Sequence, residues 1–249
     1  MLKTNDSHVH VGQFNDKYFH PKTVCKFLNT VDVEYFAVSS TTVCGGDLDR
    51  MINDLYKTIE LSSQRALPVL WLTPEILKDD ACAELVRCGL NWGCVKMHGY
   101  HGWTDNEIEQ AVLIANQLNV PFMMHTGGRP CCEAGQYYQL CKNHQERDFI
   151  LAHSRPCDDA IMIMKNCCNV WADTAFTPLD DIIKMVNAGL EDRILWGSDY
   201  PIPALYYKRE NLATQYCEKR DLLFKSIEYE SYKKIVSENY MTLFNFNIR

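Results

Sequence analysis

Hydrophobic and polar residues form two kinds of pattern that alternate along this chain. Short runs rich in Val, Ile, Leu and Phe predict strands, and longer segments with hydrophobic residues at helical spacing separate one run from the next. The predicted strands cover residues 7–12, 33–40, 66–72, 94–98, 121–125, 148–153, 169–173 and 193–199. Eight strands that alternate with helices predict a parallel sheet covered on both faces.

The helical segments carry start and stop signals of their own. Leu48, Met51 and Leu55 recur at helical spacing. Thr104 followed by Glu107 forms the pattern of a capping box, which predicts the start of another helix. The predicted helices cover an amphipathic stretch that starts near residue 21 and residues 47–63, 79–88, 104–118, 156–166, 178–189 and 229–244.

Chain length helps to choose between two ways of arranging such a sheet. The chain has 249 residues, and a (β/α)8 barrel needs about 250. A doubly wound open sheet is the alternative, but neither a Gly-x-Gly-x-x-Gly segment nor a P-loop follows any predicted strand. We therefore expect an α/β fold of the TIM-barrel type, with residues 1–249 as a single domain.

The net charge and the cysteine content limit which binding partners and which cellular compartment are expected for this protein. The formal net charge of −7 offers no basic face for nucleic acid or an anionic membrane, and no apolar run approaches the roughly 20 residues that cross a bilayer. The twelve cysteines include no Cys-x-x-Cys pair, and the N-terminal residues do not have the pattern of a signal peptide. We expect reduced thiols in a cytoplasmic protein, for which a homodimer is one option.

Two histidines at the end of the first predicted strand are the first candidates for chemistry. His8 and His10 are two positions apart, so their side chains point to the same face of an extended strand. Their backbone positions lie about 7 Å apart, and both rings can tilt onto one ion because a Zn–N bond is about 2 Å long. A His-x-His pair alone is equally compatible with a half-buried strand end.

Other chemically active residues end later strands. In a closed barrel the carboxyl ends of all strands converge on one mouth, where catalytic residues lie. Nitrogen ligands with one carboxylate suit Zn²⁺ best, with Mn²⁺ and Fe²⁺ as alternatives. The residues that join His8 and His10 at this mouth are Lys96, His98, His125, His153 and Asp199.

Four segments together resemble the amidohydrolase superfamily. They are Asp6-Ser7-His8-Val9-His10, Met124-His125-Thr126-Gly127, Leu151-Ala152-His153 and Trp196-Gly197-Ser198-Asp199-Tyr200-Pro201. The closest resemblance is to the branch that includes aminocarboxymuconate semialdehyde decarboxylase and pyrone-dicarboxylate lactonase. The ending Glu238-Asn239-Tyr240-Met241-Thr242-Leu243-Phe244 is also similar to the ending of that branch, so the resemblance covers nearly the whole chain.

The resemblance implies a metal-dependent barrel enzyme and a role for each strand-end residue. Asp199 would be both a metal ligand and the proton acceptor for water, and His153 would hold or polarise the substrate. Lys96 would bridge a second metal in a two-metal member or act as a basic residue in a one-metal member. His98 would contact the substrate or serve the structure. The implied ligands of the first metal are His8, His10, His125 and Asp199.

Two arginines indicate the charge of the substrate. Arg129 and Arg155 follow His125 and His153 closely, so both are expected on loops at the mouth. A guanidinium binds a carboxylate or phosphate with two hydrogen bonds, although a surface ion pair is the alternative role. We therefore expect an anionic small molecule as substrate. Asp6 shares the inward face of the two histidines and is expected to orient them or the barrel core.

The leading hypothesis is a metal-dependent hydrolase of a C–O or C–N bond in a small, carboxylated lactone, ester or amide. A decarboxylase on the same barrel is the close alternative, because the ligand set is shared and the pocket loops decide the chemistry. A non-catalytic barrel that binds a metal or ligand is the alternative from another class. Retention of both Asp199 and His153 argues against it, since a purely structural metal site needs neither a base nor a polarising group.

Overall fold

The strands form one curved sheet in the order β2-β1-β3-β4-β5-β6-β7-β8-β9. A computed structural model describes residues 2–78, 80–207 and 211–244. Within these residues β2 pairs antiparallel with β1, and the eight other strands pair in parallel. The strands are β1 (Thr4–Phe14), β2 (Lys17–Phe19), β3 (Val33–Ser40), β4 (Ala66–Leu72), β5 (Cys94–Met97), β6 (Phe122–His125), β7 (Phe149–Ala152), β8 (Val170–Asp173) and β9 (Ile194–Leu195).

The chain just after β9 meets β1 and closes the sheet into a barrel. Ser7 N–H donates to the carbonyl of Trp196, and Asp199 N–H donates to the carbonyl of His8, both over 2.8 Å. Further along, Val9 and Tyr200 form a parallel bridge. The predicted TIM-barrel class is therefore confirmed, and the closing seam passes through the residues expected at the mouth.

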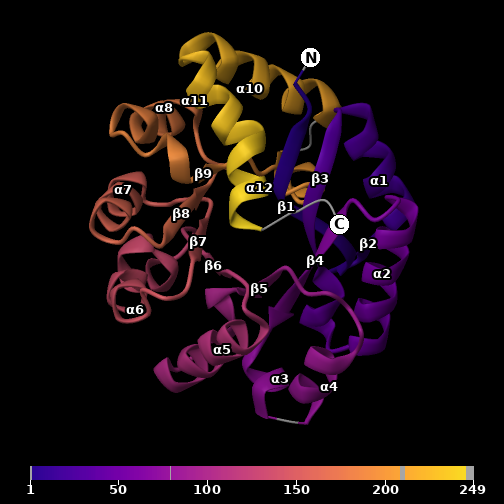
Figure 1. Cartoon of the computed structure of the whole chain (residues 1–249). Helices are drawn as coiled ribbons and strands as arrows, with labels where there is room; N and C mark the ends of the chain where they lie inside the picture. Colours follow the sequence, from indigo (N-terminus) through magenta and orange to yellow (C-terminus); the bar gives the residue numbers. More distant parts are fainter. Residues whose placement is uncertain (1, 79, 208–210, 245–249) are drawn as a thin grey trace.

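Helices lie on the outside of the ring of strands, where they cover its apolar outer face (Figure 1). The predicted helices are present: α4 forms the helix expected over 79–88, whose first residue, Asp79, lies outside the described residues, and α3 precedes that segment. The helix α10, the hairpin strand β2 and several short helices were not predicted. The α-helices are α1 (Pro21–Thr30), α2 (Leu48–Leu61), α3 (Pro74–Lys78), α4 (Ala81–Arg87), α5 (Asp105–Leu118), α6 (Tyr138–Asn143), α7 (Cys157–Asn166), α8 (Leu179–Asn187), α9 (Pro203–Tyr207), α10 (Leu212–Ser226), α11 (Tyr229–Lys233) and α12 (Asn239–Leu243).

Alternation along each strand divides the core in two. Residues such as Val95, Met124 and Leu151 face outward into the layer beneath the helices. Their neighbours point inward and form a separate apolar layer inside the barrel, because successive side chains of a strand face opposite sides. This inner layer consists of Ala37, Leu67, Val69, Cys94, Met123, Ile150, Ala152, Trp171 and Leu195, together with Tyr240, Leu243 and Phe244.

The C-terminal helical segment packs on the inner layer. Residues 229–243 run through α11, a π-helical turn (Lys234–Glu238) and α12. In Figure 1 this yellow segment lies against the ends of β1 and β9. The side-chain amide of Asn239 donates to the carbonyls of Glu191 and Ile194, 2.7 Å from each, and ties the segment to the start of β9. The apolar floor of the barrel is thus completed by residues far from the strands in sequence.

All twelve cysteines have free thiols in the structure. Among the described residues, no helix combines the length and the apolar character needed to span a bilayer.

Candidate active site

A layer of polar side chains lies directly beyond the inner apolar layer, and the two-residue period of the strands explains its position. Lys96 comes two residues after the inward-facing Cys94 of β5, so it faces inward as well. The same step leads from Met123 to His125 on β6. The residues that follow this rule on other strands include Ser39 on β3 and Asp173 on β8.

His8, His10 and Asp199 converge in this layer. All three are buried, and each offers one ligand atom within 4.8 Å of the others. Asp199 Oδ1 lies 2.8 Å from His10 Nε2 and 3.3 Å from His8 Nε2. Two imidazole nitrogens and a carboxylate oxygen therefore point at one region, as the sequence analysis expected.

The second ring nitrogen of each of these histidines is also bonded. His8 Nδ1 lies 2.7 Å from Asp173 Oδ2, and His10 Nδ1 lies 2.9 Å from Ser39 Oγ. The sequence analysis missed both partners. Their signal was the position at the end of a predicted strand, in register with the other inward residues, but neither residue type suggested a role by itself.

Lys96 lies against the same two histidines. Its Nζ is 2.6 Å from His8 Nε2 and 3.4 Å from His10 Nε2, and the side chain is buried. The ammonium also lies 4.7 Å from the centre of the Trp71 ring. Burial lowers the pKa of Lys96 to about 8, against the opposing charges of Asp199 and Asp173. The two Nε2 atoms thus already face a cation.

The charge states of the group fit metal ligands. Burial, with the neighbouring Lys96 charge, lowers the pKa of His10 to about 3, so its ring is neutral at pH 7. Burial raises the pKa of Asp199, but contacts with His8 and His10 outweigh it and lower the value to about 2. Neutral imidazole and ionised carboxylate are the forms that bind metal.

His125 and His153 form a second pair beside this group. His125 Nδ1 lies 3.2 Å from His153 Nε2, and the outer nitrogens face the carbonyls of Gly127 at 3.2 Å and Ala175 at 3.0 Å. Burial, with the Lys96 charge, lowers the pKa of His125 to about 3, and burial lowers that of His153 well below its usual range. His125 therefore lies next to His153 rather than within the group of His8, His10 and Asp199.

His98 lies immediately after β5 and faces the same space. Its ring stacks on His125 with ring centres 3.8 Å apart, and its Nδ1 accepts a hydrogen bond from the Tyr100 N–H. Burial lowers the pKa of His98 far below its usual range, so the ring is neutral. The neighbouring His101 lies in a short 3-10 turn (Gly99–His101).

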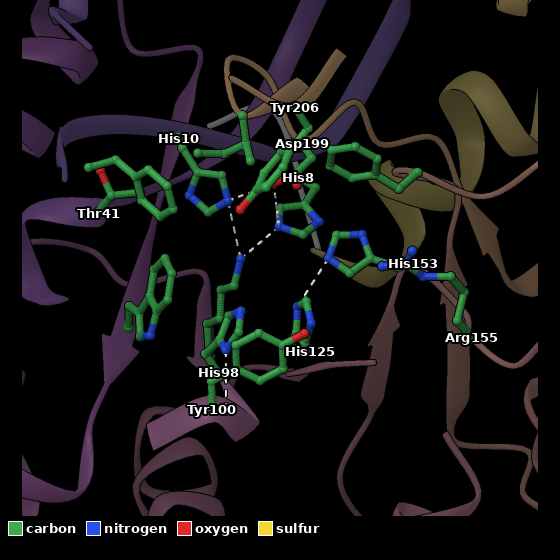
Figure 2. Close-up of a pocket in the computed structure, with 15 residues that line it drawn as sticks. His8, His10, Thr41, His98, Tyr100, His125, His153, Arg155, Asp199 and Tyr206 are labelled. Carbon is green, nitrogen blue, oxygen red and sulfur yellow. Dashed lines mark hydrogen bonds and ion pairs between the residues drawn. The ribbon is translucent and has the colours of Figure 1, made fainter. Parts of the chain in front are cut away.

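A cavity of about 310 Å³ opens above these residues (Figure 2). Histidines, Lys96 and Asp199 form its floor, and aromatic rings form most of its walls. Trp71, Tyr100 and Phe176 all line it. The remaining lining residues are Phe14, Thr41, Arg155, Ile202 and Tyr206.

The two predicted substrate-binding arginines differ in position. Arg155 lines the cavity, and its buried Nε has no hydrogen-bond partner in the part of the chain that the structure describes. Its side chain packs on Gly127, where an added Cβ would lie 2.8 Å from Arg155 Nε. Arg129 is exposed and lies 4.1 Å from the centre of the Tyr100 ring, outside the cavity lining. Of the two arginines, Arg155 is the one that lines the cavity.

Three cavity residues have backbone conformations that L-amino acids rarely adopt. The φ angles of His153, Phe176 and Asp199 are 72°, 55° and 57°. Such conformations cost roughly 1–3 kcal/mol each and cluster at functional sites, where the surrounding structure enforces them. In Asp199 the turn lets the N–H bond to His8 while the carboxylate points back to His10.

Asp6 holds the two sides of the closing seam together beneath the site. Its Oδ1 accepts hydrogen bonds from the His8 N–H at 3.1 Å and the Ser198 N–H at 3.0 Å. Burial raises its pKa to about 7, against the hydrogen bonds from Ser198 and His8. Asp6 was expected to orient the histidines or the barrel core, and its contacts are with the backbone of His8 and Ser198.

The fold is thus a closed α/β barrel with buried histidines and an ionised aspartate at its mouth. The sequence matches the family described as Amidohydrolase over residues 6–239. The chain therefore belongs to the amidohydrolase family, whose members are generally metal-dependent enzymes. A comparison with curated protein sequences returns no match.

Solved structures share the fold at low sequence identity. Amidohydrolase 2 from Bifidobacterium longum subsp. infantis is 13% identical with a TM-score of 0.68, covering 99% of this chain and 100% of that one. Metarhizium anisopliae IDCase is 10% identical with a TM-score of 0.68, covering 98% and 97%. A D-hydantoinase is 13% identical with a TM-score of 0.69, covering 96% and 70%.

Proposed function

We propose that this protein is a metal-dependent hydrolase that cleaves a C–O or C–N bond in a small carboxylated molecule. The observation that carries the proposal is the convergence of His8, His10 and Asp199, all buried, below a cavity that His153 also lines. His10 is neutral and Asp199 is ionised, as ligands of a divalent ion must be. Zn²⁺ suits this set best, with Mn²⁺ and Fe²⁺ as alternatives.

Each side chain then has a task that follows from its position. A bound ion would supply a water with a pKa lowered from 15.7 to about 7. Asp199, ionised at neutral pH, would be the group that accepts a proton from such a water. His153 Nδ1 donates to the carbonyl of Ala175, which fixes the ring. In the neutral ring Nε2 then carries a lone pair, so His153 would hold the substrate by accepting a hydrogen bond rather than stabilise negative charge on the substrate oxygen.

The contacts of His125 and His153 help to decide whether the site binds one metal ion or two. Both outer nitrogens face carbonyls, which only accept, so in neutral rings these nitrogens carry the protons. The inner nitrogens, 3.2 Å apart, then present two lone pairs to each other. Two ligands of one tetrahedral ion with bonds of about 2.0 Å are about 3.3 Å apart, so the pair also suits a cation.

One ion on His8, His10 and Asp199, with His125 as a further ligand, is our first proposal. A second ion at His125 and His153, with Lys96 as the bridge, is the alternative. His98 would contact the substrate in either case.

The walls of the cavity support an anionic, partly apolar substrate. The guanidinium of Arg155, which lines the cavity, would donate to a carboxylate, and Trp71, Tyr100 and Phe176 offer ring faces to the rest of the molecule. Such a cavity would also suit a decarboxylase of an unsaturated acid, as in the branch that includes aminocarboxymuconate semialdehyde decarboxylase.

The metal content of purified protein tests this proposal. Elemental mass spectrometry on wild type, His8→Ala, His125→Ala and Lys96→Ala should give about one divalent ion per chain in wild type. Loss with either histidine variant and retention in Lys96→Ala supports one ion. A content of two ions per chain in wild type, with one of them lost in Lys96→Ala, supports the alternative in which Lys96 bridges two ions. Wild type without metal after reconstitution contradicts the proposal.

A substrate panel separates the two reactions. Lactones, amides and unsaturated acids are assayed in parallel for release of acid and for release of carbon dioxide. Turnover with acid release alone supports the hydrolase, and carbon dioxide release supports the decarboxylase. His153→Ala serves as the inactive control, because it leaves the His8, His10 and Asp199 group intact.

A further inference from the structure

The carboxylate of Asp173 is held in one place by both of its oxygens. Oδ2 lies 2.7 Å from His8 Nδ1, and Oδ1 accepts a hydrogen bond from the N–H of Ala175. The side chain is completely buried. Gly197 leaves room for it, since an added Cβ there would lie 2.6 Å from Asp173 Oδ1.

The backbone of Asp173 is fixed as well. Its N–H donates to Ser154 Oγ at 3.1 Å, and its carbonyl accepts from the hydroxyls of Ser154 and Thr177 at 3.0 and 3.1 Å. Ser154 follows His153 directly, so the same contacts anchor the turn that carries this histidine. Asp173 therefore cannot swing away from His8 without breaking several buried hydrogen bonds.

This geometry determines which nitrogen of His8 carries the proton. An ionised carboxylate only accepts, so Nδ1 must be the donor to Asp173. In a neutral ring Nε2 is then a bare lone pair directed toward Asp199 and Lys96. We propose that Asp173 is a positioning residue that holds His8 in the orientation and tautomer that bind the metal. This inference rests on the metal centre of the proposed function.

Asparagine at this position should reverse the tautomer. Its amide oxygen would take the place of Oδ1, because the buried N–H of Ala175 needs an acceptor. Its NH₂ group would then face His8 Nδ1, which must become an acceptor, and the proton would move to Nε2. An Asn in place of the Asp of a Ser-His-Asp triad acts through the wrong tautomer in the same way.

The test compares Asp173→Asn with Asp54→Asn. Asp54 is equally buried and is bonded to the hydroxyls of Tyr18 and Thr42, so it is a matched control outside the site. Zn²⁺ affinity of metal-depleted protein is measured by competition with a chelating dye. Loss of the partner of a ligating histidine typically weakens metal binding 10–100-fold. We expect that loss for Asp173→Asn and a change below threefold for Asp54→Asn.

A second readout needs no metal and no turnover. In the ¹⁵N NMR spectrum of the metal-free protein, His8 should be protonated at Nδ1 in wild type and at Nε2 in Asp173→Asn. A wild-type His8 with a bare Nδ1 overturns the inference, as does a variant with wild-type affinity for Zn²⁺. Wild type that binds no Zn²⁺ contradicts the proposed function instead.

Discussion

At the scale of single residues, the charge of Lys96 decides how a metal ion can bind in the site. Lys96 is the buried cation that lies against His8 and His10, where a metal ion would also be attracted. Two like charges 4 Å apart repel by about 4 kcal/mol at an effective dielectric constant of 20. A protonated Lys96 therefore opposes a metal on these histidines, whereas a Lys96 that bridges ions supports it, which is why Lys96→Ala distinguishes the two arrangements.

Arg155→Met should weaken substrate binding more than it slows the chemical step. The Arg155 Nε has no hydrogen-bond partner among the described residues, and a hydrogen bond to a charged group contributes about 1.5–3 kcal/mol. We expect KM for a carboxylated substrate to rise roughly 10–100-fold, with kcat changed less than fivefold. Arg129→Met, on the exposed side of Tyr100, is the control and should leave both constants within threefold. Equal effects of the two substitutions would contradict the role of Arg155.

At the scale of elements, two helices after the last strand support the barrel from below and from the side. The segment ending in α12 completes the apolar floor, and α10 brings Lys219 to the end of β8. The Lys219 ammonium donates to the carbonyl of Thr174 at 2.7 Å. The polar layer therefore depends on packing from elements that contribute no candidate catalytic residue.

Leu243→Ala should destabilise the fold without touching the site. Leu243 is 5% exposed and packs inside the barrel, and truncation of a buried leucine costs about 2–5 kcal/mol. Urea denaturation followed by far-ultraviolet circular dichroism measures the free energy of unfolding. Leu113→Ala, at a helical position that is 61% exposed, should change it by less than about 0.5 kcal/mol. A loss below 1 kcal/mol in Leu243→Ala would show that α12 does not close the floor.

Lys219 should give the stability a distinctive dependence on pH. Burial lowers the pKa of Lys219 to about 8, against the charges of Asp173 and Asp6, whereas an unfolded lysine titrates near 10.4. Between these values the unfolded chain binds more protons, so this residue makes the folded state more stable as pH rises from about 8 to 10.4. Below pH 8 the destabilising effect of the buried charge is fully present.

The comparison with Lys219→Met isolates this contribution. Urea denaturation at pH 7.5 and pH 10 should show the wild type gaining up to roughly 3 kcal/mol relative to the variant. Groups that titrate in both proteins cancel in the difference. Parallel pH profiles for wild type and variant would contradict a lowered pKa of Lys219.

The elements and the site differ in how far the sequence predicts them. The eight barrel strands are predictable because each is a short apolar run between amphipathic segments. The strand β2 and the helix α10 escaped prediction, because three half-exposed residues and a weakly amphipathic segment give little periodic signal. Strand-end positions predicted the convergence of His8, His10 and Asp199.

Sequence patterns could not predict the contacts that side chains make across the barrel. The bond between His8 and Asp173 joins residues 165 positions apart and depends on closure of the sheet. Loop geometry separates Arg155, in the cavity, from Arg129, on Tyr100, although both follow a strand-end histidine by a few residues. The pairing of His125 with His153 likewise depends on the positive φ of His153.

At the scale of the whole molecule, the candidate metal ligands lie on the seam that closes the barrel. His8 and His10 belong to β1, and Asp199 belongs to the chain after β9, which reaches β1 through backbone hydrogen bonds. An ion held by all three would join the first and last strands directly. Metal binding should therefore stabilise the entire barrel as well as the cavity.

This link predicts a thermal shift on metal loading. A ligand that binds only the folded state at 100 times its Kd adds about 2.7 kcal/mol of stability. For a chain of this size each kcal/mol shifts Tm by about 2–4 °C, so Zn²⁺ should raise Tm by roughly 5–10 °C over metal-depleted protein. Differential scanning calorimetry with and without Zn²⁺ measures the shift. His10→Ala should lose most of it, because the carboxylate of Asp199 is then left with one imidazole. If Zn²⁺ raised the Tm of His10→Ala as much as that of wild type, the ion would bind away from the seam between β1 and the chain after β9.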